Sequence, residues 1–251
     1  MPCITITLCE CSENHIGMEK NGKMAINGFD NTHFENVIKT YCNKTIERIN
    51  LNSYLQEESD NYVGKPAELL IIRNAIENAE DIYNELNNLE WDKKYYDVRR
   101  KAVLNKRART NLCFGKNGQA SNYENKKGTI VSYNNIPLFN KEKNKLINGL
   151  REDENFIECE GNNYNNVKKN GIGWHGDGER KKVAGMRYGE SMSLCFNWFK
   201  DCKPIGKKFE TILNSGDIYI MSEKATGNDW RKKKIIYTLR HSAGAEKYTT
   251  I

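Results

Sequence analysis

The chain contains few histidines and no long apolar run. Four histidines occur among its 251 residues. No apolar stretch approaches the ~18–20 residues that a membrane-spanning helix needs. The first residues also lack the basic and apolar regions of a secretory signal. We therefore expect an intracellular protein of the cytoplasm or nucleus that is neither secreted nor bound to a membrane.

Zinc-binding cysteine patterns are also absent. The eight cysteines include no Cys-x-x-Cys pair, and Cys9 and Cys11 stand too close together for an ordinary zinc knuckle. In a reducing compartment, cysteines of this kind are usually free buried thiols. Structural zinc is therefore not what we expect to organise this fold.

The charge balance is moderately basic. The formal net charge is +6, which permits a polyanionic partner without establishing one. Lysine and arginine cluster at 99–101, 106–107, 180–182 and 231–234. Such clusters are most often solvated loops or helix faces, but two of these flank the segments that hold the candidate site residues.

The first part of the chain is expected to be an N-terminal extension of unknown role, residues 1–65. Its alternating residues 4–8 predict a strand. Thr32 followed by Glu35 resembles a capping box at the start of a helix. Gly and Pro at 64–66 are typical of a linker to the main domain, residues 66–251.

In the main domain, a few helices precede many short strands. A buried strand is predicted at 69–72, and helices are predicted at about 79–89 and 139–150. Further strands are expected at 155–159, 183–188, 192–199, 208–212, 216–222, 235–241 and 246–250. This order is typical of an α+β protein built on a β-sandwich or jelly roll.

A possible metal-binding motif lies in the segment 171–179. His175 and Asp177 stand two positions apart. Together with a second histidine they could form the 2-His-1-carboxylate face of non-haem iron oxygenases. A bare His-x-Asp is a weak signal by itself. His241 is the other histidine of the main domain, so it is the expected third ligand.

Motifs around this pair stand in a recognisable order. Phe156, Asn162 and Tyr164 fit F-x5-N-x-Y, and 172–179 fit I-x-W-H-x-D-x-E. Two later segments fit LG-x-S and L-x-x-G-D strands, at 188–199 and 213–221. The order resembles that of the AlkB-like family of Fe(II)/2-oxoglutarate-dependent dioxygenases, over about residues 67–251.

The resemblance implies a double-stranded β-helix (jelly-roll) core with flanking helices. His175, Asp177 and His241 would bind Fe(II), and 2-oxoglutarate and O2 would be cosubstrates. The implied reaction is oxidative demethylation of N-alkylated nucleic-acid bases, in DNA or RNA repair or in removal of a modification. One departure is the 24-residue step from Asp217 to His241, about twice the family's usual spacing, which an insertion near 225–234 would explain.

The cosubstrate site is implied less uniquely. Asn162 and Tyr164 resemble the family's cosubstrate-binding pair, and their i, i+2 spacing places both on one face of a strand. The family's carboxylate-binding Arg lies on the last strand. Here Lys247 with Thr249 could supply a cation and a hydroxyl, and Arg240 is the competitor. An alternative alignment makes Arg240 the cosubstrate ligand and leaves the distal histidine missing.

The substrate side is expected to include a lid at about 107–133. Its Arg109 and Tyr123 combine cationic and aromatic character, which suits phosphate contact and base stacking. An ordinary glycine-containing surface loop has the same composition. Glu179 matches the family's base-contacting carboxylate. Trp174 is a further candidate for substrate contact, although core packing is its more ordinary role.

Two other interpretations remain open, and a third is rejected. The same oxygenase chemistry could act on a protein side chain or a small molecule, which a shallow acidic mouth would favour. A catalytically inactive barrel that binds nucleic acid is the second alternative, supported by the short C-terminus and the displaced His241. A metal-free ligand-binding jelly roll explains none of the motifs.

Overall fold

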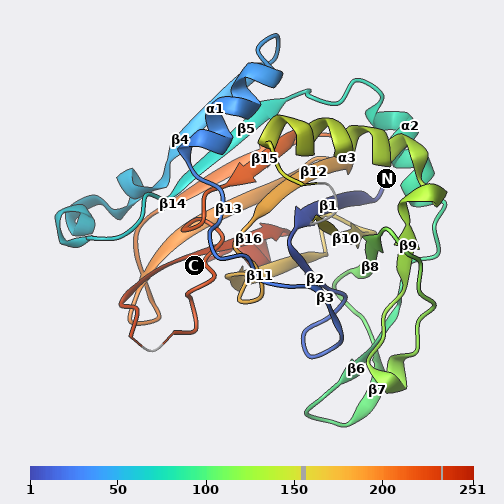
Figure 1. The fold of residues 1–251 in the computed structure, drawn as a ribbon. Helices are drawn as coiled ribbons and strands as arrows, with labels where there is room; N and C mark the ends of the chain where they lie inside the picture. Colours follow the sequence, from blue (N-terminus) through green and yellow to red (C-terminus); the bar gives the residue numbers. More distant parts are fainter. Residues whose placement is uncertain (154–156, 233) are drawn as a thin grey trace.

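The chain folds into two β-sheets and a layer of helices, a mixed α+β architecture (Figure 1). The computed structural model describes residues 1–153, 157–232 and 234–251. The larger sheet has eight strands in the order β4-β5-β15-β12-β1-β10-β8-β9, and the smaller has four in the order β11-β16-β13-β14. No helix in the described part of the chain is long and apolar enough to cross a membrane.

The strand bounds are as follows. The larger sheet contains β4 (Thr45–Asn50), β5 (Glu68–Arg73), β15 (Ile218–Met221), β12 (Val183–Gly189), β1 (Cys3–Cys9), β10 (Glu158–Tyr164), β8 (Thr110–Gly115) and β9 (Ile130–Ser132). The smaller sheet contains β11 (Gly171–His175), β16 (Tyr237–Gly244), β13 (Met192–Lys200) and β14 (Lys203–Leu213). Two hairpins pair β2 (Cys11–Glu13) with β3 (Lys20–Gly22), and β6 (Lys94–Asp97) with β7 (Ala102–Asn105).

The helices are α1 (Asn31–Thr40), α2 (Ala79–Asn87), α3 (Pro137–Leu150) and the short α4 (Glu246–Thr249). Short 3-10 segments lie at Tyr123–Asn125 and Tyr133–Asn135, and Leu51–Asn61 consists of two such segments with a kink at Gln56. Helix α3 begins at Pro137, two residues before the expected start, because proline at the first helical position loses no hydrogen bond. Glu85 accepts from the backbone N–H groups of Leu138 and Phe139 and so caps this end.

The first strand lies in the middle of the larger sheet. β1 pairs antiparallel with β10 on one side and with β12 on the other. β4 also pairs with β5 across the expected boundary near residue 65. Residues 1–65 were expected to form an extension, but they share a sheet and a hydrophobic core with residues 66–251.

Central strands of the larger sheet, such as β5 and β15, supply two cores through alternate side chains. Leu70 and Ile72 of β5 join the core beneath α1, α2 and α3, whereas Leu69 and Ile71 join the core between the two sheets. A strand buried on both faces reads as a continuous apolar run. The gap between the sheets is therefore filled by side chains except where polar residues line a pocket.

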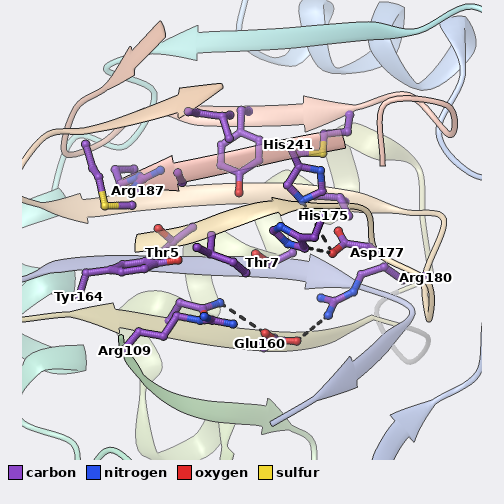
Figure 2. A pocket seen from close by; sticks show the side chains of 18 residues that line it. Thr5, Thr7, Arg109, Glu160, Tyr164, His175, Asp177, Arg180, Arg187 and His241 are labelled. Carbon is purple, nitrogen blue, oxygen red and sulfur yellow. Dashed lines mark hydrogen bonds and ion pairs between the residues drawn. The ribbon is translucent and has the colours of Figure 1, made fainter. Parts of the chain in front are cut away.

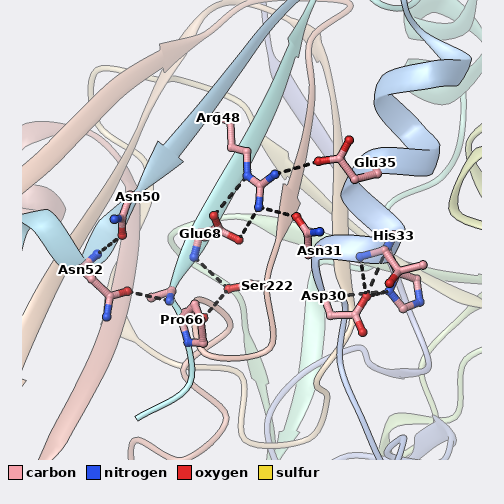
Figure 3. A network of polar contacts seen from close by, with 12 residues as sticks. Asp30, Asn31, His33, Glu35, Arg48, Asn50, Asn52, Pro66, Glu68 and Ser222 are labelled. Carbon is pink, nitrogen blue, oxygen red and sulfur yellow. Dashed lines mark hydrogen bonds and ion pairs between the residues drawn. The ribbon is translucent and has the colours of Figure 1, made fainter. Parts of the chain in front are cut away.

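Polar contacts tie the N-terminal segment to the rest of the chain (Figure 3). Arg48 of β4 donates to Glu35 and Asn31 of α1 and to both carboxylate oxygens of Glu68 in β5. The Glu68 backbone N–H in turn donates to the Ser222 hydroxyl, 2.9 Å away. These bonds join three separate regions of the sequence.

The start of α1 differs from the expected capping box. Asp30, not Thr32, is the N-cap, and its carboxylate accepts from the backbone N–H groups of Thr32 and His33. The His33 ring completes the box by accepting from the Asp30 N–H. Glu35 instead binds Arg48. An aspartate two residues earlier thus supplies the acceptor that the threonine was expected to provide.

Two predicted strands also need correction. The segment 246–250 forms α4 instead of a strand, because β16 ends at Gly244, whose φ of +103° turns the chain. The strand expected at 155–159 begins at Glu158. Phe156, the first residue of the F-x5-N-x-Y motif, lies outside the described residues.

Candidate metal centre and its pocket

Two strands of the smaller sheet bring His175, Asp177 and His241 together. His175 ends β11 and pairs directly with His241 of β16, so that their ring centroids lie 4.4 Å apart. The Nε2 atom of each ring is 3.8 Å from Asp177 Oδ1. The three candidate ligand atoms lie within 4.8 Å of one another (Figure 2). His241 therefore lies within a strand and not, as expected, at its end.

Both imidazoles have lowered pKa values, which favours their neutral form. His175 Nδ1 lies 2.7 Å from the Gly173 carbonyl oxygen. A proton on Nδ1 would be donated there, leaving the Nε2 lone pair free on the side of Asp177. Burial lowers the pKa of His175, and burial together with the neighbouring His175 and Arg180 lowers that of His241. Neutral imidazole is the form that binds a metal ion.

The loop between β15 and β16 holds the metal-binding segment in place. The Asp177 N–H donates to the Thr226 carbonyl, 2.9 Å away. A Cβ atom at Gly176 would lie 2.1 Å from the Gly227 carbonyl oxygen, so only glycine allows this approach. The region expected to be an insertion, 225–234, thus packs against the His-x-Asp turn; residue 233 itself lies outside the described residues.

A pocket opens from the metal centre between the two sheets. Its floor on the larger sheet is made by alternate residues of neighbouring strands, because every second side chain of a strand points to the same face. The polar residues that line it are Thr5, Thr7, Arg109, Glu160, Asn162, Tyr164, Arg180, Arg187 and Tyr219. Apolar residues of both sheets, among them Ile172, Leu194 and Met221, complete the lining.

Arg180 closes one end of the pocket with two carboxylates. Its side chain is 4% exposed, and Nη2 lies 2.6 Å from Glu160 while Nε lies 2.9 Å from Glu179. Burial alone would raise the pKa of Glu160, but the charge and hydrogen bond of Arg180 outweigh it and lower that pKa. The buried Arg180 charge is therefore fully compensated.

Arg187 lies in the same pocket with different surroundings. It is 1% exposed, and its Nη1 is 3.1 Å from the sulfur of Cys3. Its Nε has no hydrogen-bond partner, and no carboxylate lies within ion-pair distance of it in the part of the chain that the structure describes. Thr5, its direct cross-strand neighbour, also has a buried hydroxyl without a partner among those residues.

Comparison with known proteins gives one relative of similar length. The chain is 41% identical to an uncharacterized protein of Acanthamoeba polyphaga mimivirus over 255 aligned positions, which cover 98% of this chain and 96% of the viral protein. The chain belongs to the family of this mimivirus protein. No established family model matches the chain. The name of the mimivirus relative states no activity.

The predicted cosubstrate residues of this chain divide into those that line the pocket and those that do not. Asn162 and Tyr164 line the pocket side by side on β10. Lys247 is exposed above the Tyr248 ring, and Thr249 donates to the Glu246 carbonyl in α4.

Arg240 does not line the pocket either. Its guanidinium stacks over the Phe199 ring, 4.2 Å from the centroid, because a strand neighbour of the inward-facing His241 points outward. Lys247 with Thr249, and Arg240 as their competitor, were the alternatives expected for the cosubstrate carboxylate, and none of them is among the residues that line this pocket.

The predicted substrate residues divide in the same way. Arg109 lines the pocket and donates to Asn162. Glu179 is bound to Arg180 and does not line the pocket. The Tyr123 hydroxyl donates to Asp92, and the Trp174 indole donates to the Thr250 carbonyl. Tyr123 and Trp174 are therefore structural contacts in this conformation, not pocket residues.

Sequence reasoning missed Arg187, Thr5 and Thr7. The available signals were a cation inside the otherwise apolar strand 183–188 and two threonines alternating with apolar residues at 4–8. Either pattern can arise in a half-buried strand that faces water. Only the pairing of β1 between β10 and β12 shows that these side chains face a pocket.

Proposed function

We propose that this protein is an Fe(II)- and 2-oxoglutarate-dependent dioxygenase that removes N-alkyl groups from nucleic-acid bases. The observation that carries the proposal is the convergence of His175, Asp177 and His241, whose ligand atoms lie within 4.8 Å at the edge of a pocket. Two imidazole nitrogens and one carboxylate oxygen suit Fe(II) and leave one face open for small ligands.

The strand order supports a double-stranded β-helix as the finer description of the fold. From β10 to β16 the chain passes repeatedly between the two sheets, and β10, β12 and β15 face β11, β16 and β13 across the pocket. A strand following β16 would return to the place between β10 and β12. β1 from the other end of the chain occupies that place, so we infer a jelly roll whose last strand comes from the N-terminus.

Fe(II) bound at this face would supply the activation of O2, coupled to oxidation of 2-oxoglutarate to succinate and CO2. One oxygen atom enters succinate, and the other enters a C–H bond of the substrate methyl group. The resulting N-hydroxymethyl group breaks its C–N bond, which gives formaldehyde and the N–H base. The lowered pKa values of His175 and His241 favour the neutral imidazoles that bind Fe(II).

The positive charge around the pocket favours a nucleic acid over a protein side chain as the substrate. Arg109, Arg180 and Arg187 line it beside Glu160 and Asp177. Arg109 also lines a neighbouring hollow on the surface, together with Arg100, Lys106 and Arg107. Cations at the mouth of a pocket suit contact with phosphates on either side of an extruded base. The acidic mouth expected for the protein-substrate alternative is not seen among the described residues.

The test is formaldehyde and succinate release from N-methylated single-stranded DNA and RNA, with Fe(II) and 2-oxoglutarate added. Wild type is compared with His175→Ala and with His33→Gln, a matched loss of a histidine outside the pocket. Formaldehyde from wild type and His33→Gln but not from His175→Ala is the expected result. Succinate without formaldehyde would reject the base substrate, and no product at all would favour an inactive nucleic-acid-binding barrel.

A further inference from the structure

Arg187 is a buried cation whose charge the described residues do not compensate. It is 1% exposed, its nearest polar contact is the neutral sulfur of Cys3, and its Nε is unpartnered. An unpaired buried charge is costly, so buried charges are usually paired or hydrogen-bonded. The other strongly buried arginine of the pocket, Arg180, follows that rule through Glu160 and Glu179.

The surroundings of Arg187 offer hydrogen bonds but no negative charge. Thr5 stands directly opposite it on β1, and Asn162 stands opposite Thr5 on β10, so the three form one row across the floor of the pocket. The Thr5 hydroxyl is buried and unpartnered. Tyr164, two residues along β10, lines the same end (Figure 2). A guanidinium whose Nε has no partner, beside a hydroxyl without a partner, matches a carboxylate, which accepts from both.

We propose that Arg187, with Thr5, binds the distal carboxylate of the oxo-acid cosubstrate whose other end meets the metal centre. This assignment rests on the proposed function and names a residue that the family resemblance did not. Of the other pocket cations, Arg180 binds two carboxylates, whereas Arg109 donates to Asn162 and also lines the neighbouring surface hollow. Lys247 and Arg240, the cations expected from the sequence, do not reach the pocket.

The dimensions of the sheet agree with a short dicarboxylate. The row that contains Arg187 lies two residues along β1 from the row that contains Thr7 and Glu160. Two residues of a strand span about 6.6 Å, which is comparable with the length of a five-carbon diacid. In Figure 2, Arg187, Thr5 and Tyr164 are drawn toward one side of the pocket and Asp177 and Arg180 toward the other. A five-carbon diacid can therefore extend along the pocket floor.

The experiment measures binding of glutarate to the full-length, metal-free protein with a chelator present. Glutarate has both carboxylates but no 2-oxo group, so its binding does not depend on metal chelation. Unfolding temperature and titration calorimetry report binding, at ionic strength matched with sodium chloride. Acetate serves as the monocarboxylate comparison. The variants are Arg187→Met, Arg187→Lys, Thr5→Val and Lys247→Ala, with Arg99→Met as a matched loss of an exposed arginine.

We expect glutarate to stabilise wild type, Arg99→Met and Lys247→Ala alike. Arg187→Met should weaken binding about 10- to 100-fold, the loss expected for a charge-assisted hydrogen-bonded pair. Arg187→Lys should restore part of it, because lysine keeps the charge but not the paired donors. Thr5→Val should give a smaller loss than Arg187→Met.

Other outcomes overturn the assignment. No response of wild type to glutarate, equal binding by Arg187→Met, or a loss confined to Lys247→Ala would each do so. Because the measurement is made without metal, failure of the iron site is seen separately, in metal titrations of wild type and His175→Ala. A folded Arg187→Met protein is confirmed from its own unfolding transition before binding is compared.

Discussion

Arg180 and Arg187 line the same pocket and are both nearly inaccessible to solvent, but only Arg180 has carboxylate partners among the described residues. The difference separates a structural charge from one available for a ligand. Arg180 is the ion-pair partner of the buried Glu160 and contributes most to lowering the pKa of that carboxyl, with a further contribution from Arg109. Arg187 contacts the Cys3 sulfur and has no carboxylate partner among the described residues.

The two arginines should therefore differ in their effect on stability. Arg180→Met leaves Glu160 buried without its ion-pair partner and should cost about 3–5 kcal/mol of unfolding free energy. Arg187→Met removes an uncompensated charge and should be neutral or stabilising in the absence of ligand. Urea denaturation of the two variants beside wild type measures both values. Equal destabilisation would show that Arg187 has a structural role after all.

The metal centre makes a prediction that is independent of any substrate. Removing His175, Asp177 or His241 as a ligand, by alanine or by Asp177→Asn, should weaken binding of Fe(II) or Co(II) by at least about 100-fold, more than loss of an outer-shell partner costs. Anaerobic titration with Co(II), followed by its visible absorption, measures the affinity. His33→Gln serves as the control and should bind like wild type. Retained affinity in His241→Ala would favour the alignment without a distal histidine.

Gly176, directly before Asp177, should not tolerate alanine, whereas Gly173 of β11 should tolerate it. Gly176→Ala places a Cβ atom 2.1 Å from the Gly227 carbonyl oxygen. The resulting shift should cost about 1–3 kcal/mol and should also weaken metal binding by moving Asp177. Gly173→Ala is the matched control, because nothing lies within 4 Å of the added atom. Unfolding free energy and Co(II) affinity of both variants test this.

His33 should make stability depend on pH. Hydrogen bonding to Glu152 is the main cause that raises its pKa, with further contribution from Asp30. A raised folded-state pKa stabilises the fold below the unfolded value of ~6.5, and this contribution is lost as the pH rises through the folded pKa. His33→Gln keeps a side chain suited to the capping box. It should therefore lower stability by about 0.2–1 kcal/mol at mildly acidic pH and by less at alkaline pH.

His15 should change the pH dependence of stability in the opposite direction to His33. Burial lowers the pKa of His15 to about 4, so it stays neutral in the folded protein where the unfolded chain begins to bind a proton. Wild type therefore loses the His15 contribution as the pH falls below ~6.5. His15→Gln should flatten the acidic side of the stability profile, whereas His33→Gln should steepen it. Unfolding temperatures from about pH 5 to about pH 9 distinguish the two.

Residues 66–251 alone should not form a stable domain. Without β1, the facing edges of β10 and β12 lose their partner along the full length of the strand. Unpaired buried backbone groups and a vacant strand position are incompatible with a packed sheet. Circular dichroism and proteolysis of the truncated chain, compared with full length, measure this. A cooperative unfolding transition in the truncated chain would contradict the prediction.

Much of the local structure could be predicted from the sequence. Apolar runs such as 69–72 and 183–188 gave strands close to their observed bounds because side-chain patterns reflect burial directly. The candidate metal-ligand set was accessible for a different reason: few histidines exist, and His175 stands in a recognisable motif. The structure places His241 beside it, as the histidine count suggested.

Arg187, the cation that we propose for the carboxylate, was not accessible in the same way. The sequence directed attention to residues after His241, where Lys247 lies, because the family resemblance places that cation on a strand later in the chain. The chain instead turns at Gly244 into α4, and β1 lies between β10 and β12. Strand pairing between distant segments leaves no local signal, so neither Thr5 nor Arg187 could be recognised before the sheet order was known.

The central position of β1 has a consequence for biosynthesis. β1 leaves the ribosome before either partner, because Cys3 pairs with Tyr164 on one side and with Gly189 on the other. Until those strands have been synthesised, both edges of the apolar β1 segment are unpaired. Exposed edges of this kind favour chaperone binding. Such distant contacts also slow folding. The pocket can therefore appear only late in synthesis, and a nascent chain stalled before β12 should carry no ligand-binding capacity.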